Sequence, residues 1–306
     1  MALENIVALA GGVGGAKLAD GLARLLPDHA LTVIVNIGDD FERYGLHISP
    51  DLDTVTYTLG GVSNTETGWG LAGESWQMLG MLQTYGEEPW FRLGDKDIAT
   101  HLLRTSLLNQ GVTLTEITDR LRTALGIRQY IRPASNDRCA TMVNTVEEGT
   151  LAFQEYFVRH RWQPTVTQVW YDGIASATPS AEVITALENA HAIIICPSNP
   201  VLSIDPILAL GDVRERLLQR RVPCVAVSPL IHGQAVKGPA PKIMQELGEA
   251  ASTEGLLSFY NGLIDVLVVD RGDGLAERTW ETEIMMHTPA DRERLAREVL
   301  EFIGRL

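Results

Sequence analysis

The 306-residue sequence has few cysteines, few aromatic residues and no long apolar run. Its three cysteines, Cys139, Cys196 and Cys224, lie far apart and form no C-x-x-C pair, which excludes a disulfide framework and a cysteine-rich zinc site. No apolar stretch approaches the length of a membrane span, and the N-terminal stretch carries an acid where a signal peptide carries positive charge. The sequence therefore predicts a soluble, cytoplasmic protein.

Positive charge is also scarce. The chain has 25 Lys and Arg residues against 39 Asp and Glu residues, for a net charge of −14, and no run rich in Lys or Arg. Nucleic acids and anionic membranes bind clustered positive charge, so neither is an expected partner. Phosphate groups can still bind locally, through backbone N–H groups, a few basic side chains and a metal ion.

The order of the apolar segments predicts a doubly wound α/β fold. A strand at 5–10, a glycine-rich turn, a helix and a second strand at 31–35 form its typical opening. We expect residues 1–64 and 177–306 to form a Rossmann-like, mostly parallel sheet with helices on both faces. Residues 65–176 break this pattern, with several helices and then short alternating segments. They predict an inserted, mainly helical subdomain with a few short strands.

A glycine-rich segment, GGVGGAK, follows the first predicted strand. Glycines at the start of a helix let backbone N–H groups approach a phosphate. The segment is not a dinucleotide fingerprint, because Lys17 occupies the third glycine position, and it is not a Walker A loop, because Leu18 follows that lysine. A tight turn without a ligand is the alternative. The candidate phosphate contacts are Gly11, Gly12, Gly14, Gly15 and Lys17.

Four carboxylates follow the second predicted strand: Asp39, Asp40, Asp51 and Asp53. Acids this crowded repel one another unless a cation or a proton lies between them. The alternative is a solvated loop in which Asp forms turns and caps a helix. Mg²⁺ prefers one or two carboxylates together with substrate phosphates, so some of the four are expected to be structural. Their position alone favours Asp40 and Asp53.

Polar residues also follow later strands. Ser198 and Asn199 lie between two prolines at the end of the strand HAIIIC, and Lys237 lies in a glycine-containing loop after the next strand. Ligands bind at the carboxyl ends of parallel strands, although Asn199 could simply cap a turn. Arg92, near the start of a predicted helix, is a candidate for contacting a phosphate or stacking on a ring. A surface salt bridge is its more ordinary role.

Five segments taken together resemble the CofD family, the 2-phospho-L-lactate transferases of coenzyme F420 biosynthesis. They are ALAGGVGGAKLADGL, VNIGDDFERYGLHISPDLDTVTY, FRLGDKDIATHLLR, CPSNPVLSIDPIL and VSPLIHGQAVKGPAPKIM. The resemblance implies a Rossmann-like core, a homodimer and a reaction that uses Mg²⁺. It also implies transfer of a phospholactyl-type group from a guanosine-diphosphate-linked donor to the ribityl hydroxyl of the deazaflavin Fo, with release of GMP. The acid could derive from phospholactate, phosphoenolpyruvate or phosphoglycerate.

The resemblance also implies roles for individual residues. Asp53 and Arg92 correspond to contacts with Fo. The glycine segment, Ser198 and Asn199 correspond to the donor-nucleotide side, and Lys17 and Lys237 to diphosphate contacts. Asp39 and Asp40 become the expected metal pair, with Asp40 and Asp53 as the catalytic candidates. The base that accepts the proton of the alcohol stays open among Asp39, Asp40 and Asp53.

A second family from another functional class shares part of this pattern. YvcK-type proteins have a similar glycine-rich first turn and PSNP segment, and they are nucleotide-sugar-binding regulators of carbon metabolism. The segments ISPDLDT and RLGDKD favour the transferase. An NAD-dependent oxidoreductase is disfavoured, because the third glycine and the ribose-binding acid after the second strand are missing.

Overall fold

The computed structural model describes residues 4–236, 238–275 and 277–306. Its centre is a seven-stranded sheet in which every neighbouring pair of strands is parallel. The spatial order is β14 (Thr279–Glu281), β13 (Val266–Val269), β10 (Cys224–Val227), β9 (Ala192–Ile195), β1 (Ile6–Ala10), β2 (Leu31–Val35) and β5 (Tyr130–Pro133). All five residues of β1 are buried, as expected for a central parallel strand that is covered on both faces.

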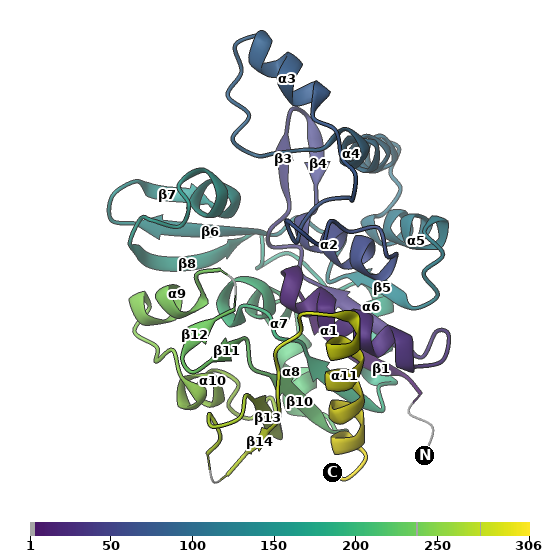
Figure 1. Ribbon diagram of the computed structural model, residues 1–306, viewed down its shortest axis with the longest axis vertical. Coiled ribbons are helices and arrows are strands. Elements are labelled where there is room, and N and C mark those ends of the chain that lie inside the picture. Colours follow the sequence, from purple (N-terminus) through teal and green to yellow (C-terminus); the bar gives the residue numbers. More distant parts are fainter. Residues whose placement is uncertain (1–3, 237, 276) are drawn as a thin grey trace.

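Helices cover both faces of this sheet, which confirms the predicted fold class (Figure 1). One face packs against α1 (Gly12–Leu25), α2 (Pro50–Leu59), α5 (Leu114–Ala124) and α11 (Pro289–Ile303). The other packs against α6 (Ala181–Glu188), α7 (Asp205–Leu208), α8 (Val213–Leu218), α9 (Ala240–Glu246) and α10 (Thr253–Phe259). Strand side chains alternate between these two apolar layers, so the core lies on both sides of the sheet. No helix among the described residues is long and apolar enough to cross a membrane.

The strand order reverses direction between β1 and β9. The chain runs outward from β1 through β2 to β5, and then from β9 through β10 and β13 to β14. Loops that leave the two central strands therefore diverge at their carboxyl ends, which is where doubly wound folds bind ligands. Two hydrogen bonds cross this point: the Ser198 hydroxyl accepts from the Gly11 N–H at 3.1 Å and donates to the Gly11 carbonyl at 2.7 Å.

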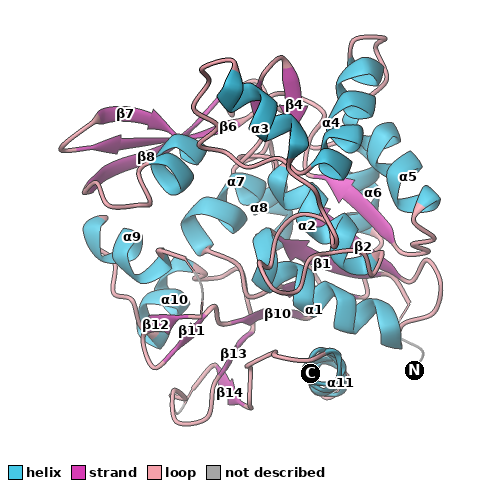
Figure 2. Cartoon of the chain, turned by 45° about the horizontal axis from the view of Figure 1, so that its top comes forward, coloured by secondary structure: helices cyan, strands magenta, loops and turns pink. Residues whose placement is uncertain are grey.

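Two segments of the chain, here called excursions, leave the central sheet, one before β5 in the sequence and one after it. The first contains β3 (Phe41–Arg43), β4 (Leu46–Ile48), α3 (Gln77–Thr84) and α4 (Asp95–Leu108). The second contains the antiparallel strands β6 (Ala140–Thr145), β7 (Gly149–Ala152) and β8 (Val166–Asp172) and the π-helix η1 (Glu155–Arg159). Figure 2 shows the β6–β8 sheet on the left and α4 and α5 on the right, with α1, α2 and α7 between them.

The structure differs from the predicted single insertion over residues 65–176. Residues 130–133 form β5, which pairs in parallel with β2 inside the central sheet. The physical reason lies in its edge position. Only Ile131 and Pro133 of this strand are buried, so its sequence alternates like that of an antiparallel strand. The residues outside the Rossmann-like core therefore fall into two segments.

Candidate functional site

The glycine-rich turn packs directly against an acid from α2. Asp51 accepts a hydrogen bond from the backbone N–H of Gly12, the first residue of α1. A Cβ at Gly11 would lie 2.7 Å from Asp51 Oδ2 and 2.6 Å from the Cβ of Ser203, so only glycine allows this approach. The carboxylate lies at the amino end of α1, where the helix dipole favours negative charge. The turn predicted to bind phosphate thus already holds one carboxylate of the acidic loop.

Asn36, at the end of β2, joins two of the four acids. Its side-chain nitrogen donates to Asp39 Oδ1 at 3.0 Å and to Asp51 Oδ2 at 2.9 Å, and its oxygen accepts from the N–H of Gly38 at 2.7 Å. All three polar side chains are buried. Burial, reinforced by the charge of Asp51, raises the pKa of Asp39 well above its usual value. Burial likewise raises the pKa of Asp51 to about 6.

Asp40 belongs to the same cluster of charges but has different partners. Its Oδ2 accepts from the Ser49 hydroxyl at 2.8 Å and lies 3.1 Å from Nε2 of His47. Burial raises the pKa of Asp40, and the contacts with His47 and Ser49 partly offset this effect. Its Oδ1 is buried and has no hydrogen-bond partner among the described residues. The two mutually repelling carboxylates, Asp39 and Asp51, are a donor pair that fits Mg²⁺, and the unsatisfied oxygen of Asp40 belongs to the same acidic cluster.

Asp53 is held in an ion pair. Both of its oxygens accept hydrogen bonds from the guanidinium of Arg104, one of them at 3.1 Å, and both side chains are buried. Ligand atoms of Asp53, Asp97 and His101 lie within 4.8 Å of one another, a spacing that a metal ion could use. The Arg104 guanidinium lies 3.1 Å from Asp53 and 3.2 Å from the His101 ring, so a fixed positive charge is already present there.

Ser198 and Asn199 build the junction between the two central strands. The Asn199 side chain accepts from the N–H groups of Val201 and Leu202, each at 3.0 Å, and caps the π-helix η2 (Pro200–Ile204). This is the cap that the alternative interpretation of the segment described. η2 brings Ser203 against Gly11 and places the Leu202 carbonyl 3.3 Å from the Asn36 amide. π-Helical turns are frequent at functional sites.

The basic residues predicted for the site lie in different surroundings. Lys17 donates to the carbonyl of Met286 at 2.8 Å, on the segment that precedes α11. Arg92 is exposed and stacks on the ring of Trp76, with 4.2 Å between its guanidinium carbon and the ring centre. Lys237 lies outside the described residues.

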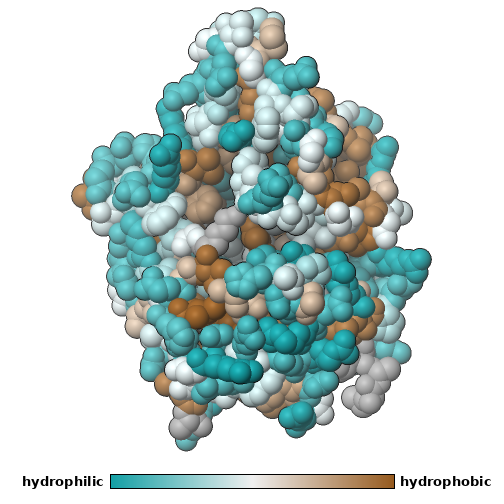
Figure 3. All heavy atoms as spheres, in the orientation of Figure 1, coloured by the Kyte–Doolittle hydropathy of each residue, from teal (hydrophilic) through white to brown (hydrophobic). Residues whose placement is uncertain are grey.

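Sequence reasoning missed a group of aromatic side chains in the first excursion. The ring of Phe41, on β3, lies 4.8 Å from that of Phe91 and 6.4 Å from that of Trp90. Trp69 meets Trp76 edge to face at 6.2 Å. The available signal was the placement of three of the chain's six tryptophans between residues 69 and 90. Figure 3 shows a hollow with hydrophobic atoms inside it, between the part that contains α3, the β6–β8 sheet and the body below.

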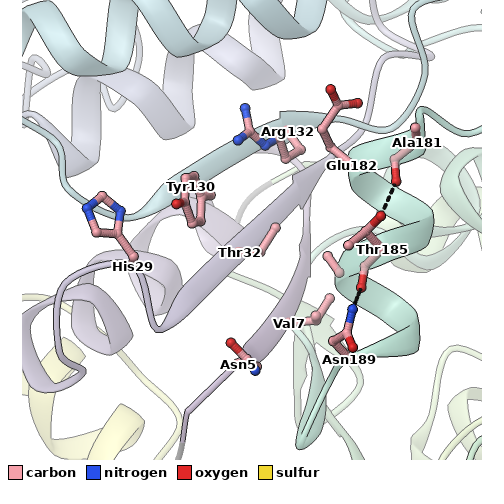
Figure 4. Close-up of a pocket in the computed structure, with 11 residues that line it drawn as sticks. Asn5, Val7, His29, Thr32, Tyr130, Arg132, Ala181, Glu182, Thr185 and Asn189 are labelled. Atoms are coloured by element: carbon pink, nitrogen blue, oxygen red, sulfur yellow. Dashed lines mark hydrogen bonds between the residues drawn. The ribbon is translucent and has the colours of Figure 1, made fainter.

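A separate cavity of about 570 Å³ lies on the sheet face that α6 covers (Figure 4). Its floor is a row of neighbouring strand residues, Val7, Thr32 and Tyr130, and α6 forms one wall. None of the predicted site residues lines it. We therefore place the candidate site at the carboxyl ends of β1, β2 and β9, and not in this cavity.

Comparisons with known proteins show which proteins this chain is similar to. A family model described as 2-phospho-L-lactate transferase CofD matches residues 6–305. The 2-phospho-L-lactate transferase of Methanospirillum hungatei is 41% identical over 298 residues, which cover 96% of this chain and 99% of that protein. The phosphoenolpyruvate transferase of Kitasatospora aureofaciens is 44% identical over 277 residues, covering 88% and 86% of the two chains.

A solved structure supports the fold. A member of the UPF0052 family from Bacillus halodurans superposes with a TM-score of 0.63 at 14% identity, covering 97% of this chain and 99% of that one. At this identity the likeness concerns the fold alone. The match of the family model over nearly the whole chain and the identity to its relatives confirm the resemblance found in the sequence. The chain belongs to the 2-phospho-L-lactate transferase CofD family.

Proposed function

We propose that the protein transfers a phospholactyl-type group from a guanosine-diphosphate-linked donor to the ribityl hydroxyl of the deazaflavin Fo, with release of GMP. The observation that carries this proposal is the set of buried carboxylates, bridged by Asn36, beside the glycine-rich turn at the switch point. Phosphoryl-type transfer needs little covalent chemistry from a protein but requires charge stabilisation and positioning at one place. Family membership supports the transferase class.

The relatives do not agree on the three-carbon acid that is transferred. The Methanospirillum hungatei protein is named for 2-phospho-L-lactate and the Kitasatospora aureofaciens protein for phosphoenolpyruvate, at 41% and 44% identity. We therefore propose a donor that carries phospholactate, phosphoenolpyruvate or phosphoglycerate, and leave the choice to the product analysis below.

We propose Asp39 and Asp51 as the residues that hold Mg²⁺, with Asp40 beside them. The sequence favoured Asp39 and Asp40, but Asn36 joins Asp39 to Asp51. When bound, Mg²⁺ would neutralise the diphosphate and the charge that develops during transfer. The amino end of α1 lies beside Asp51, and the dipole of this helix favours an anionic donor.

Asp40 is the better candidate for the group that accepts the proton of the attacking alcohol. Its Oδ1 has no hydrogen-bond partner among the described residues, whereas both oxygens of Asp53 accept from Arg104. Burial raises the pKa of Asp40, and a base is more effective when its pKa approaches the working pH. Asp53, on the same turn of α2 as Asp51, would orient the acceptor.

The aromatic side chains of the first excursion support a planar acceptor. Phe41, Trp90 and Phe91 pack against one another, and Arg92 stacks on Trp76 nearby in the chain. Aromatic rings and guanidinium groups stack on flat conjugated ligands, and the deazaflavin ring of Fo is one.

The test is product analysis with purified protein. Fo, Mg²⁺ and each candidate guanylylated acid are incubated together, and the product is identified by mass. We expect one donor to give a phosphodiester of Fo together with GMP, and we expect EDTA or Asp51→Asn to abolish it. Asp28→Asn, an acid-to-amide change in an exposed ion pair with Arg128, is the matched control and should retain turnover. Tight binding of a UDP-sugar, with no product from any donor, would instead support a regulator.

A further inference from the structure

Helix α4 has an unusual buried face. Its three buried residues are Asp97, His101 and Arg104, in a helix of 14 residues. Spacings of four and three residues place them on one side of the helix. Helices of globular proteins normally bury an apolar stripe, because burying charged groups costs free energy. An all-ionisable buried face therefore calls for a reason other than packing.

The partner of this face is α2, the helix that carries Asp51 and Asp53. Arg104 donates to both oxygens of Asp53, and its guanidinium lies 3.2 Å from Nδ1 of His101. One turn further along α2, the Tyr57 hydroxyl donates to Asp97 Oδ1 at 2.6 Å. His101 Nε2 lies 3.3 Å from Asp97 Oδ2, which closes the network.

The same turn of α4 also supports the β3–β4 hairpin. The hydroxyl of Thr105 accepts from the backbone N–H of His47 at 2.8 Å, and Arg104 donates to the His47 carbonyl at 3.5 Å. The imidazole of His47 in turn lies 3.1 Å from Asp40 Oδ2. The adjacent residues Arg104 and Thr105 of α4 therefore hold Asp53 directly and Asp40 through His47.

Stability alone does not account for such a network. Replacing a complete buried ion pair by apolar residues of similar volume is often neutral or stabilising in proteins, so the fold does not require one. A bidentate guanidinium, however, fixes the direction of a carboxylate as well as its charge. The geometry therefore indicates orientation of the carboxylates as the role of the network.

We propose that Arg104 is a positioning residue for the transfer reaction, which orients Asp53 directly and Asp40 through the backbone of His47. This inference rests on the proposed function, because it assigns Asp40 and Asp53 to the reacting groups. Small displacements of such groups can lower turnover by about 100-fold. Lysine keeps the charge of Arg104 but loses the planar fork, so Arg104→Lys separates orientation from charge.

The experiment compares Arg104→Lys with Arg122→Gln. Arg122 is also a buried arginine paired with an aspartate, Asp119 at 2.7 Å, but it lies on α5. We expect Arg104→Lys to lower kcat about 100-fold with little change in the KM of the donor, and to keep a melting temperature near that of the wild type. Arg122→Gln should lower the melting temperature and leave kcat unchanged. Wild-type kcat in Arg104→Lys would overturn the proposal.

A double-mutant cycle tests whether Arg104 acts through Asp53. In an Asp53→Asn background, Arg104→Lys can lower kcat only through its effect on Asp40. The fall in kcat of the double variant should therefore be smaller than the product of the falls in the two single variants. Independent, multiplying losses would refute the assignment. Should Arg104→Lys fail to fold, Thr105→Val removes the hydrogen bond to His47 and is expected to lower kcat with normal Fo binding.

Fo binding, followed by its fluorescence, separates this inference from the proposed function. A wild type that binds no Fo and yields no product refutes both. A wild type that forms product, while Arg104→Lys matches it in kcat, refutes the positioning role and leaves the proposed function intact. Weaker Fo binding by Arg104→Lys than by Arg122→Gln supports the role independently of turnover.

Discussion

Ionisation of Asp51 should make the protein less stable at neutral pH when no divalent cation is present. The side chain is 5% exposed and shares the Asn36 amide with Asp39. Burial raises its pKa from 3.8 to about 6. The perturbation to test is Asp51→Asn, which removes the ionisable group and keeps an oxygen that can accept from Asn36.

The sign and size follow from the two pKa values of Asp51. Below pH 3.8 the carboxyl is protonated in both the folded and the unfolded chain. Between pH 3.8 and about 6 the unfolded chain has lost this proton while the folded chain retains it, so the free energy of unfolding falls as the pH rises. Above about pH 6 the loss is complete. At about 1.36 kcal/mol per pH unit, it amounts to about 3 kcal/mol.

Urea denaturation in EDTA at several pH values between 4 and 7.5 measures this effect. The free energy of unfolding of Asp51→Asn should exceed that of the wild type by up to about 3 kcal/mol at pH 7.5, and the difference should shrink towards pH 4. Added Mg²⁺ should stabilise the wild type and not the variant. A difference that does not change with pH, or equal stabilisation of both proteins by Mg²⁺, would refute the reasoning. Asp28→Asn serves as the exposed control.

Three further outcomes follow from contacts around the site. Gly14→Ala would place a Cβ 2.2 Å from a backbone carbonyl of the loop after β9. We expect it to lower the free energy of unfolding, measured by thermal denaturation, by about 1–3 kcal/mol. Gly80→Ala, in open space on α3, is the control and should be neutral or stabilising. Ser198→Ala removes both hydrogen bonds across the switch point and should raise the KM of the donor more than that of Fo; equal changes would contradict this. Trp76→Ala should weaken Fo binding in a fluorescence titration, and the half-exposed Trp162→Ala, outside the aromatic group, should not.

The first strand, turn and helix of the fold could be predicted from the sequence because the patterns that indicate them are local. The apolar run of β1, the glycines after it and the helical spacing of α1 lie within 25 residues and predict strand, turn and helix in order. The four acids were found for the same reason, because all lie within 18 residues of the end of β2, Asp39 and Asp40 directly after it and Asp51 and Asp53 in α2. Position in the chain did not reveal that Asn36, rather than another acid, brings Asp39 and Asp51 together.

The residues that hold the site acids in place could not be predicted from the sequence, because they depend on contacts between distant segments. Asp53 and Arg104 are 51 residues apart, and α4 contains polar residues on several sides, so its sequence does not show which face is buried. β5 was assigned to an insertion for a related reason. An edge strand alternates like an antiparallel one, and only its pairing with β2 distinguishes the two.

The first turn of α2 is the element that connects the two halves of the candidate site. Asp51 contacts the glycine-rich turn at Gly12, on the side proposed for the donor. Asp53, two residues further on, is held by Arg104 of α4, on the side proposed for the acceptor. Because a short stretch of rigid helix separates the two carboxylates, a shift of α4 reaches the glycine turn through α2 without any loop between them. The proposed placement of both substrates therefore depends on α4, a helix that belongs to the first excursion and not to the central sheet.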